Sequence, residues 1–453
     1  MYKVLKVQVS DKDKLYPYLM NIGKLSNNLY NATLFRVRQL MTSRNKEILS
    51  KNELEILKEV EVMNKCLLEK GKSERMISNS GVVNYYFLND LFRCNNNIDY
   101  LHEELPTHTA QAVVKNVTQN IKSFFEANKA YKDSKDSFAG KPKFPNYKHK
   151  NGISSFKFSN QECVIKQNKK GNFYVKLPHT KLIVNLGKKV NGKLKEVQVS
   201  FLNNIFHMIF ILDDEKETPK TKDIYKNICA IDLGLDNLMA VTNNINLPNL
   251  LYRGGYLKSI NHLYNKKIAN IVSVNTKGSN IKYEASKRYL AITNKRNNQI
   301  KDYVSKVCKH LINWCVENRI DTMVIGSNKQ WKTEINLGSP NNQNFVQIPY
   351  NLIKFNLKYR CEQLGINYIE TEESYTSKAS FLDKDEIPTL NKDSQDYIFS
   401  GKRIRRGLYK SKDGIVINAD LNGSANIMRK VFDDVDISFN NVQVIKNVSP
   451  YLE

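Results

Sequence analysis

Acidic side chains at the ends of apolar segments are the residues of this sequence best suited to chemistry. Asp232 ends the apolar run ICAID, which a turn separates from a second apolar run, NLMAVT. Asp420 stands at the start of the helical segment ADLNGSANIMRKVF. A third acidic group, Glu370, Glu372 and Glu373, lies in the run INYIETEES. Carboxylates held on rigid elements are suitable ligands for a divalent metal, and nuclease chemistry requires such fixed oxygen ligands.

Each of these positions also has a purely structural interpretation. An Asp that follows a strand often caps a turn, and an Asp ahead of a helix is a common N-cap. In the third group, the alternation of a strand places Glu370 and Glu372 on one face and Glu373 on the other. Spacing alone therefore does not choose among the three glutamates.

Cysteine and histidine usage argues against other kinds of site. The 7 cysteines form no CxxC pair, and the 7 histidines form no HExxH or HxH motif. An odd number of widely spaced cysteines favours neither a disulfide framework nor a cysteine-based zinc site. We therefore predict a reducing, cytoplasmic compartment.

The charge balance indicates a polyanionic partner. The chain has 70 Lys and Arg against 45 Asp and Glu, a net charge of +25, and its 24 Tyr and 19 Phe could stack on unpaired bases. Its apolar runs, such as IFHMIFIL, are too short to span a membrane, and the N-terminus lacks the apolar core of a secretory signal. A membrane protein, a secreted protein and a fibre are thus excluded, while a merely basic surface stays as the alternative.

Two segments concentrate the basic residues. The first, FAGKPKFPNYKHKNG at 138–152, contains prolines and glycines that prevent a helix. The second is GKRIRRGLYK at 401–410. The alternatives are a solvated linker for the first segment and an exposed, mobile loop for the second. We predict nucleic-acid contacts for Lys141, Lys143, Phe144, Tyr147, Lys148, Lys150, Lys402, Arg403, Arg405 and Arg406.

The elements that position these residues suggest an α+β multidomain protein. An alternating strand opens the chain at residues 1–12, and a helical block follows at 13–137. The basic loop and further short alternating runs occupy 138–220, and these predict a β barrel that the helical block interrupts. From 221 to 453, apolar strands alternate with helices, which is typical of an α/β domain.

Three motifs in this order resemble the TnpB family, which comprises transposon-encoded relatives of type V CRISPR effectors. ICAIDLGLDNLMAVT resembles the first RuvC motif of the family, and NADLNGSANIMRKV resembles its third. YTSKAS resembles the Thr-Ser element that precedes the family's zinc finger. The resemblance covers nearly the whole chain and implies a barrel, a helical recognition insertion and an RNase H-like (RuvC) nuclease domain.

Two departures from the family pattern affect the expected site. The second RuvC motif, DTMVIGS, has Gly326 where most members carry the catalytic Glu. A subset that includes the eukaryotic Fanzor relatives instead places a Glu in the pattern Glu-x-x-Thr-Ser, which Glu373 fits here. Glu372 is the second choice, and Glu334 a distant third.

The zinc finger is the other departure. The family's cysteines fall here at positions including Ser380, Asp383, Lys410 and Asp413, and region 376–418 contains no Cys or His. Structural zinc is bound mainly by Cys and His. We therefore predict no zinc in this degenerate finger.

The resemblance implies an RNA-guided DNA endonuclease encoded by an insertion sequence. Asp232, Glu373 and Asp420 would hold two Mg²⁺ ions, a guide RNA from the transposon end would select double-stranded DNA, and the protein would read a short adjacent motif. The first alternative is a nuclease-inactive, RNA-guided repressor, which Gly326 favours. A DNA-joining transposase and a structural nucleic-acid binder are the others.

Overall fold

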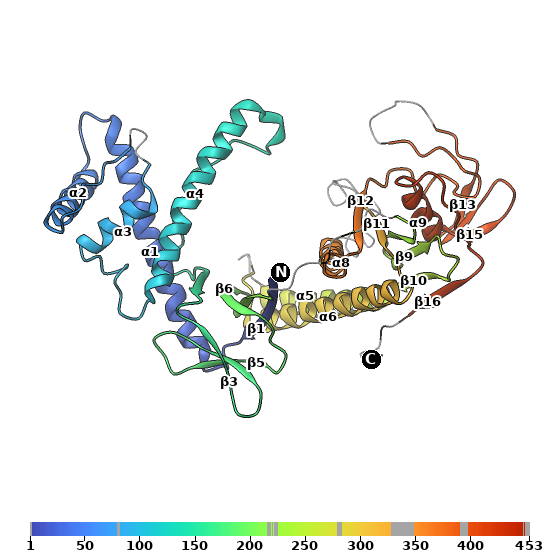
Figure 1. Ribbon diagram of the computed structural model, residues 1–453, viewed down its shortest axis with the longest axis horizontal. Coiled ribbons are helices and arrows are strands. Elements are labelled where there is room, and N and C mark those ends of the chain that lie inside the picture. The colour runs from blue at the N-terminus through green and yellow to red at the C-terminus, as the bar shows by residue number, and fades with distance from the viewer. Residues whose placement is uncertain are drawn as a thin grey trace. The chain divides into compact units, whose positions relative to one another are not determined.

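The chain folds into two compact units, Met1–Lys216 and Glu217–Glu453 (Figure 1). The computed structural model describes residues 2–78, 82–214, 219, 221, 225–278, 283–327, 348–389, 397–446 and 448. Glu334 lies outside these ranges. Within them, no helix combines the length and apolar character needed to cross a membrane.

The first unit contains two antiparallel sheets. In the larger one, β1 (Tyr2–Val9) pairs along its whole length with β7 (Ile205–Asp213), and the strand order is β1-β7-β6-β2. This order leaves β1 and β2 at open edges, so the described pairing forms a sheet, and the closed barrel stays a prediction. The other strands are β2 (Phe156–Ser159), β3 (Val164–Gln167), β4 (Phe173–Lys176), β5 (Ile183–Gly187) and β6 (Lys193–Leu202).

Helices fill the chain between β1 and β2. The two long helices, α1 (Leu15–Thr42) and α4 (Thr107–Asp133), pack on each other and bury one apolar stripe each. A capping box starts α2, where Ser50 and Glu53 each accept a hydrogen bond from the other's backbone. The remaining elements are α2 (Lys51–Glu69), α3 (Tyr85–Cys94) and the short 3₁₀ turns Ser43–Asn45 and Lys135–Ser137.

A six-stranded mixed sheet forms the centre of the second unit. Its order is β12-β11-β8-β9-β10-β16, and β8, β11 and β12 are parallel neighbours. The carboxyl ends of these three strands therefore meet at one edge. The strands are β8 (Ile228–Asp232), β9 (Asn237–Asn243), β10 (Asn249–Arg253), β11 (Thr322–Gly326), β12 (Asn367–Thr371) and β16 (Val442–Ile445).

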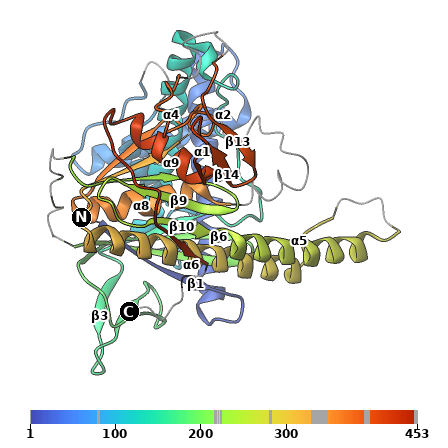
Figure 2. The ribbon, with the colours of Figure 1, turned by 90° about the vertical axis from the view of Figure 1, so that its right-hand side faces the viewer.

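Alternation along the strands explains how both faces of this sheet are covered. In β8, Cys229 and Ile231 join the core formed with α6 and α8, whereas Ile228 and Ala230 pack with α9. Figure 2 shows α5 and α6 side by side, extending past the sheet. The helices are α5 (Gly255–Thr276), α6 (Lys287–Glu317), α8 (Tyr350–Leu364) and α9 (Ala419–Arg429).

A small antiparallel sheet precedes α9. Its strands are β13 (Lys402–Arg405), β14 (Leu408–Lys410) and β15 (Val416–Asn418). Because β15 leads directly into α9, this sheet lies beside the first turn of the helix that carries Asp420.

Candidate active site

Asp232 is the last residue of β8 and lies against helix α9. A Cβ atom placed on Gly423 would be 2.8 Å from Asp232 Oδ2, which is closer than real Cβ contacts. A glycine inside a helix costs about 1 kcal/mol relative to alanine. At Gly423 the glycine is required because the Asp232 carboxylate approaches the helix backbone closely.

Glu373 occupies the space that the glycine of β11 leaves open. It follows β12 by two residues, and Gly326 pairs with Thr371 in the sheet. A Cβ atom on Gly326 would be 2.5 Å from Glu373 Oε2 and 3.3 Å from Glu373 Cβ. The carboxylate therefore lies where a side chain from position 326 would begin.

One oxygen of this carboxylate lacks a hydrogen-bond donor. Glu373 Oε2 is buried, and no described residue donates to it. An unsatisfied buried acceptor is costly, so its presence in a folded protein requires an explanation such as a bound cation.

Asp420 lies in the first turn of α9, but it is not the N-cap. Asn418 is the cap, because its Oδ1 accepts from the backbone N–H groups of Asp420 (2.9 Å) and Leu421 (3.2 Å). The Asp420 carboxylate instead accepts from Asn237 Nδ2 at 2.7 Å and forms an ion pair with Arg403 at 3.2 Å. The capping interpretation of Asp420 is thus wrong.

The other two carboxylates affect Asp232 electrostatically. Burial is the main cause that raises the pKa of Asp232 well above its ordinary value; the charges of Asp420 and Glu373 add to it and Arg403 opposes it. Burial likewise raises the pKa of Glu373 to about 7. Repulsion among acidic groups of this kind falls when a cation binds between them.

The neighbouring glutamates are paired with lysines. Glu370 binds Lys354 at 3.1 Å, and Glu372 binds Lys430 at 2.6 Å. Burial acts to raise the pKa of Glu372, but the hydrogen bonds from Lys430 and Ser374 and the charge of Lys430 together lower the pKa. Of the three glutamates that spacing could not separate, only Glu373 has a buried oxygen without a donor among the described residues.

A metal fits the donor set of these residues, although they do not form a ready-made cluster. Among the described parts of the chain, no three His, Cys, Asp or Glu side chains stand in a metal-binding group. Carboxylates suit Mg²⁺, and the Glu373 oxygen without a donor is available to a cation. Asp232, Glu373 and Asp420 are the residues that would hold it.

The arginines of the second basic segment lie beside this site. Arg403, on β13, pairs with Asp420, and Arg406 pairs with Asp236 at 2.5 Å. Asp236 also binds Lys258. Lys402 and Arg405 are exposed on the same strand. Two arginines predicted to contact phosphate are therefore paired with acidic residues, and one of these, Asp420, belongs to the candidate site.

The first basic segment runs along α1 in the other unit. The guanidinium of Arg38 lies 5.0 Å from the Phe144 ring and 4.6 Å from the Tyr147 ring. Phe144 also packs edge-to-face with Phe124, with ring centroids 5.1 Å apart. Lys148 Nζ donates to Ser154 Oγ at 2.8 Å and lies 4.0 Å from the Tyr30 ring. The remaining predicted lysines of this segment, Lys141, Lys143 and Lys150, are exposed.

Hydrogen bonds link residues at the positions where the family resemblance would place zinc-finger cysteines. Ser380 Oγ donates to Asp383 at 2.6 Å, and Asp383 accepts from the backbone N–H of Lys412 at 2.9 Å. Asp385 accepts from the N–H groups of Ser380 (2.7 Å) and Ser400 (3.1 Å). Two aspartates therefore connect the segments that cysteine ligands would join.

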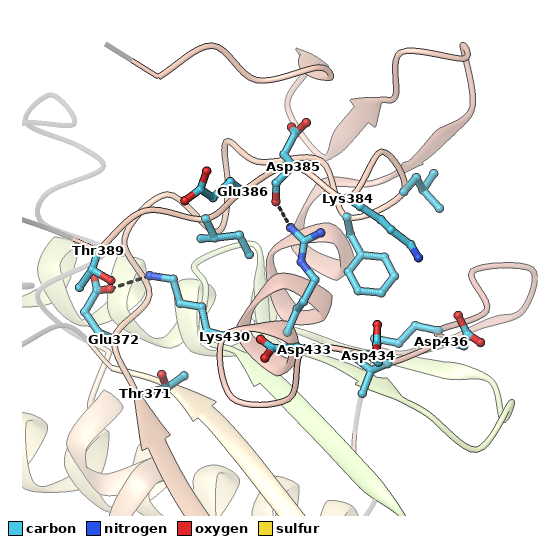
Figure 3. Close-up of a pocket in the computed structure, with 16 residues that line it drawn as sticks. Thr371, Glu372, Lys384, Asp385, Glu386, Thr389, Lys430, Asp433, Asp434 and Asp436 are labelled. Atoms are coloured by element: carbon cyan, nitrogen blue, oxygen red, sulfur yellow. Dashed lines mark hydrogen bonds and ion pairs between the residues drawn. The ribbon is translucent and has the colours of Figure 1, made fainter. Parts of the chain in front are cut away.

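A cavity of about 960 Å³ opens beside the end of β12, and none of the three carboxylates lines it (Figure 3). Glu372 reaches it from the strand end, and Lys430 lies between the cavity and α9. Its acidic lining makes it unsuitable for nucleic-acid phosphate. The acidic residues are Glu372, Asp385, Glu386, Asp433, Asp434 and Asp436.

Sequence reasoning missed several contacts of the site. Asn237 donates to Asp420, and Gly423 makes room for Asp232. Arg403 was predicted as a nucleic-acid contact, but its ion pair with Asp420 was not predicted. A glycine in the interior of a helical pattern was the one available signal, since such a glycine often marks a close contact. The contacts of Asn237 and Arg403 join elements far apart in the chain and leave no local signal.

Two family profiles match the second unit. The OrfB_IS605 profile, described as "Probable transposase", matches residues 212–332, and the "Cas12f1-like, TNB domain" profile matches residues 350–427. The matched segments contain Asp232, Gly326, Glu373 and Asp420. Over these two segments the chain is similar to transposase-associated, TnpB-like proteins.

Several solved structures are similar at low identity. A Cas12f1–sgRNA–target DNA complex is 13% identical, with 94% of this chain and 98% of that chain covered and a TM-score of 0.46. A CRISPR–Cas12f ternary complex is 13% identical over 96% and 100%, with a TM-score of 0.32. C2c1 of Alicyclobacillus acidoterrestris with single-guide RNA is 8% identical over 90% and 70%, with a TM-score of 0.37. No curated protein matches the chain.

Proposed function

We propose that this protein is an RNA-guided DNA endonuclease encoded by an insertion-sequence transposon. It cleaves guide-complementary DNA beside a short target-adjacent motif by Mg²⁺-dependent hydrolysis in an RNase H-like (RuvC) domain. The observation that carries the proposal is the buried Glu373 oxygen without a donor, placed in the space over Gly326. If Gly326 meant only that the catalytic glutamate of β11 had been lost, another glutamate, Glu373, would not be needed in the space over Gly326.

The residues of the site have distinct roles in this proposal. Asp232, Glu373 and Asp420 bind two divalent ions, which supply Lewis acidity at the phosphodiester when bound. Asn237 orients Asp420 by its hydrogen bond of 2.7 Å. Arg403 neutralises Asp420 in the free protein and presents a guanidinium that can contact a phosphate oxygen.

Guide RNA and double-stranded DNA are the partners we propose. Both units have an excess of Lys and Arg over Asp and Glu, as a protein that neutralises two nucleic acids requires. In the first unit, a cavity of about 610 Å³ is lined by Lys115, Gln119 and Lys148. Ammonium and amide groups at such a site suit contacts to phosphates and base edges, so this unit is where we expect the adjacent motif to be read.

The test uses the complex formed with the DNA that follows the gene. The protein is co-expressed with that DNA, purified, and its RNA sequenced; Mg²⁺ and a plasmid with a guide-matched site beside randomised flanks are then added. We expect cleavage by the unmodified complex and its loss in Glu373→Gln. Glu370→Gln, which alters a lysine-paired glutamate three residues before Glu373, is the matched control and should retain cleavage.

Other outcomes would overturn parts of the proposal. RNA-directed binding without any cleavage would replace the nuclease by an RNA-guided repressor. Equal loss of cleavage in both glutamate variants would remove the special role of Glu373. The absence of a specific RNA would remove the guide-dependent function.

A further inference from the structure

Helix α9 contacts the segments that carry the other two carboxylates as well as carrying Asp420. Its Gly423 makes room for Asp232, and its Ser424 donates to the carbonyl of Ala230 on β8 at 2.8 Å. The turn that follows β12 and carries Glu373 is bound to the same helix at two further points. These attachments matter because a metal ligand on a turn, such as Glu373, is held less rigidly than one on a strand.

The first point of attachment is the ion pair of Lys430 with Glu372, drawn in Figure 3. Lys430 follows the last residue of α9, and its side chain is only 8% exposed. Glu372 Oε2 accepts from Lys430 at 2.6 Å, and Glu372 Oε1 accepts from the backbone N–H of Ser374 at 2.5 Å. One carboxylate thus fixes the residues on both sides of Glu373.

The second point of attachment is the buried amide of Asn426. It donates to the carbonyl of Thr376 at 2.9 Å and to that of Ala379 at 2.7 Å. Thr376 in turn holds the Glu373 carbonyl, through its Oγ1 at 2.8 Å and its N–H at 3.3 Å. The backbone of Glu373 is therefore held from its C-terminal side as well.

We propose that Lys430, acting through Glu372, and Asn426 are positioning residues that aim Glu373 into the space over Gly326. The inference rests on the proposed function, because it assigns these residues to the metal site. Glu373 lies on a turn, whereas a glutamate at position 326 would be held by strand β11. Groups on α9 and at its C-terminal end must therefore hold Glu373 rigidly. Because the same helix carries Asp420 and contacts the segments that carry Asp232 and Glu373, the relative positions of the three carboxylates do not depend on the packing of separate loops.

The decisive variant is Lys430→Met, which keeps most of the length of the buried side chain but removes its charge. The readout is Mn²⁺ binding to the protein–guide RNA complex without DNA, measured by calorimetry. Loss of a group that orients a metal ligand typically lowers metal affinity about 10- to 100-fold, and we expect a loss in this range. Lys430→Arg should restore most of it, because the ion pair with Glu372 can re-form.

Two controls separate positioning from general stability. Lys306→Met removes a lysine paired with Asp302 at 2.6 Å on the exposed face of α6, and it should leave Mn²⁺ affinity unchanged. In a double-variant cycle, Lys430→Met combined with Glu372→Gln should lose no more affinity than the single variants, because both act through one contact. Amide hydrogen exchange of residues 374–379 should rise in Lys430→Met and stay unchanged in Lys306→Met.

The possible failures are distinguishable. If the unmodified complex binds Mn²⁺ and Lys430→Met binds it equally well, the positioning role is refuted while the proposed nuclease stands. If the unmodified complex does not bind Mn²⁺, the proposed function fails and the inference falls with it. A fall in the unfolding temperature with unchanged Mn²⁺ affinity would show that the pair is only structural.

Discussion

At the scale of single residues, their partners distinguish the three glutamates that lie close together at the end of β12. Glu370 and Glu372 are neutralised by lysines that lie 16 and 58 residues away in the sequence. Neither lysine can be assigned to its glutamate from spacing, which is why the sequence left three candidates at this strand end. Asp232 was easier to predict, because the end of a buried apolar strand marks it directly.

Gly326 gives the sharpest test at this scale. In Gly326→Ala the added methyl would meet the Glu373 carboxylate at 2.5 Å and Ile427 at 2.7 Å, so the glutamate must move. A misplacement of about 1 Å at a reacting centre can cost about 100-fold in rate, and we expect a loss of this order in cleavage. Cleavage of plasmid by the guide-loaded complex is the measurement.

The matched control for this variant is Gly255→Ala, because a Cβ atom on Gly255 meets nothing within 4 Å. It should retain full activity, and both variants should bind guide RNA as the unmodified chain does. Unimpaired cleavage by Gly326→Ala would show that the position of Glu373 over this glycine is irrelevant to the reaction.

At the scale of elements, local signals predicted more than long-range pairing. The alternating run at the N-terminus and the apolar runs before Asp232 and Gly326 are strands, because alternation and β-branched residues act locally. The small sheet at 402–418 was missed. Its four-residue and three-residue strands carry mostly exposed charged or mixed side chains and show no hydrophobic pattern.

The contacts at the start of α2 predict that the stability of the fold decreases at acidic pH. The side chain of Glu53 is 1% exposed and accepts from Lys46 at 2.7 Å and Thr42 at 2.6 Å. The hydrogen bonds from Lys46, Thr42 and Ser50 lower the pKa of Glu53 to about 2, from an ordinary 4.5. A depressed pKa stabilises the fold above pH 4.5, and this contribution is lost as the pH falls through about 2.

Glu53→Gln tests this dependence by thermal unfolding between pH 7 and pH 2. The variant should unfold at a lower temperature than the unmodified chain at neutral pH, and the difference should shrink below pH 4.5. Glu55→Gln, on the exposed side of the same helix turn, should show no such pattern. A difference that stays constant with pH would contradict the assigned role of the Glu53 charge.

For region 376–418, where the resemblance would place a zinc finger, we predict that a zinc chelator leaves the stability of the fold unchanged. Its segments are joined by Asp383 and Asp385, and removing Asp385 would leave the N–H groups of Ser380 and Ser400 without this acceptor. Loss of such an acceptor costs about 1–3 kcal/mol. Asp385→Ala should therefore lower the unfolding temperature, whereas the exposed Asp413→Ala should not.

The measurement for this region is thermal unfolding before and after dialysis against a zinc chelator, with zinc content determined by mass spectrometry. The unfolding temperature should not change on dialysis. Stoichiometric zinc whose removal lowers that temperature would show that other ligands have replaced the cysteines.

At the scale of the whole molecule, net charge indicates the class of partner, while the fold determines which charges are available. Of the predicted basic residues, Arg403 and Arg406 are paired with acids in this structure, and Lys148 lies partly buried beside Tyr30. Lys141, Lys143 and Lys150 are exposed. The number of lysines in a segment therefore overstates the number free to release counterions from a nucleic acid.

The exposed lysines of the first basic segment yield a prediction about salt dependence. Each phosphate neutralised contributes about −0.9 (duplex) or −0.7 (single strand) to the slope of log affinity against log salt. Replacing Lys141, Lys143 and Lys150 by Gln should therefore make the slope for guide RNA shallower by about 2 to 3. Lys166, Lys169 and Lys170, exposed on the β3–β4 hairpin, provide a control triple with the same change in net charge. If the two triples change the slope equally, general charge rather than a defined contact attracts the RNA; a larger change in the first triple would place the segment at the phosphate backbone.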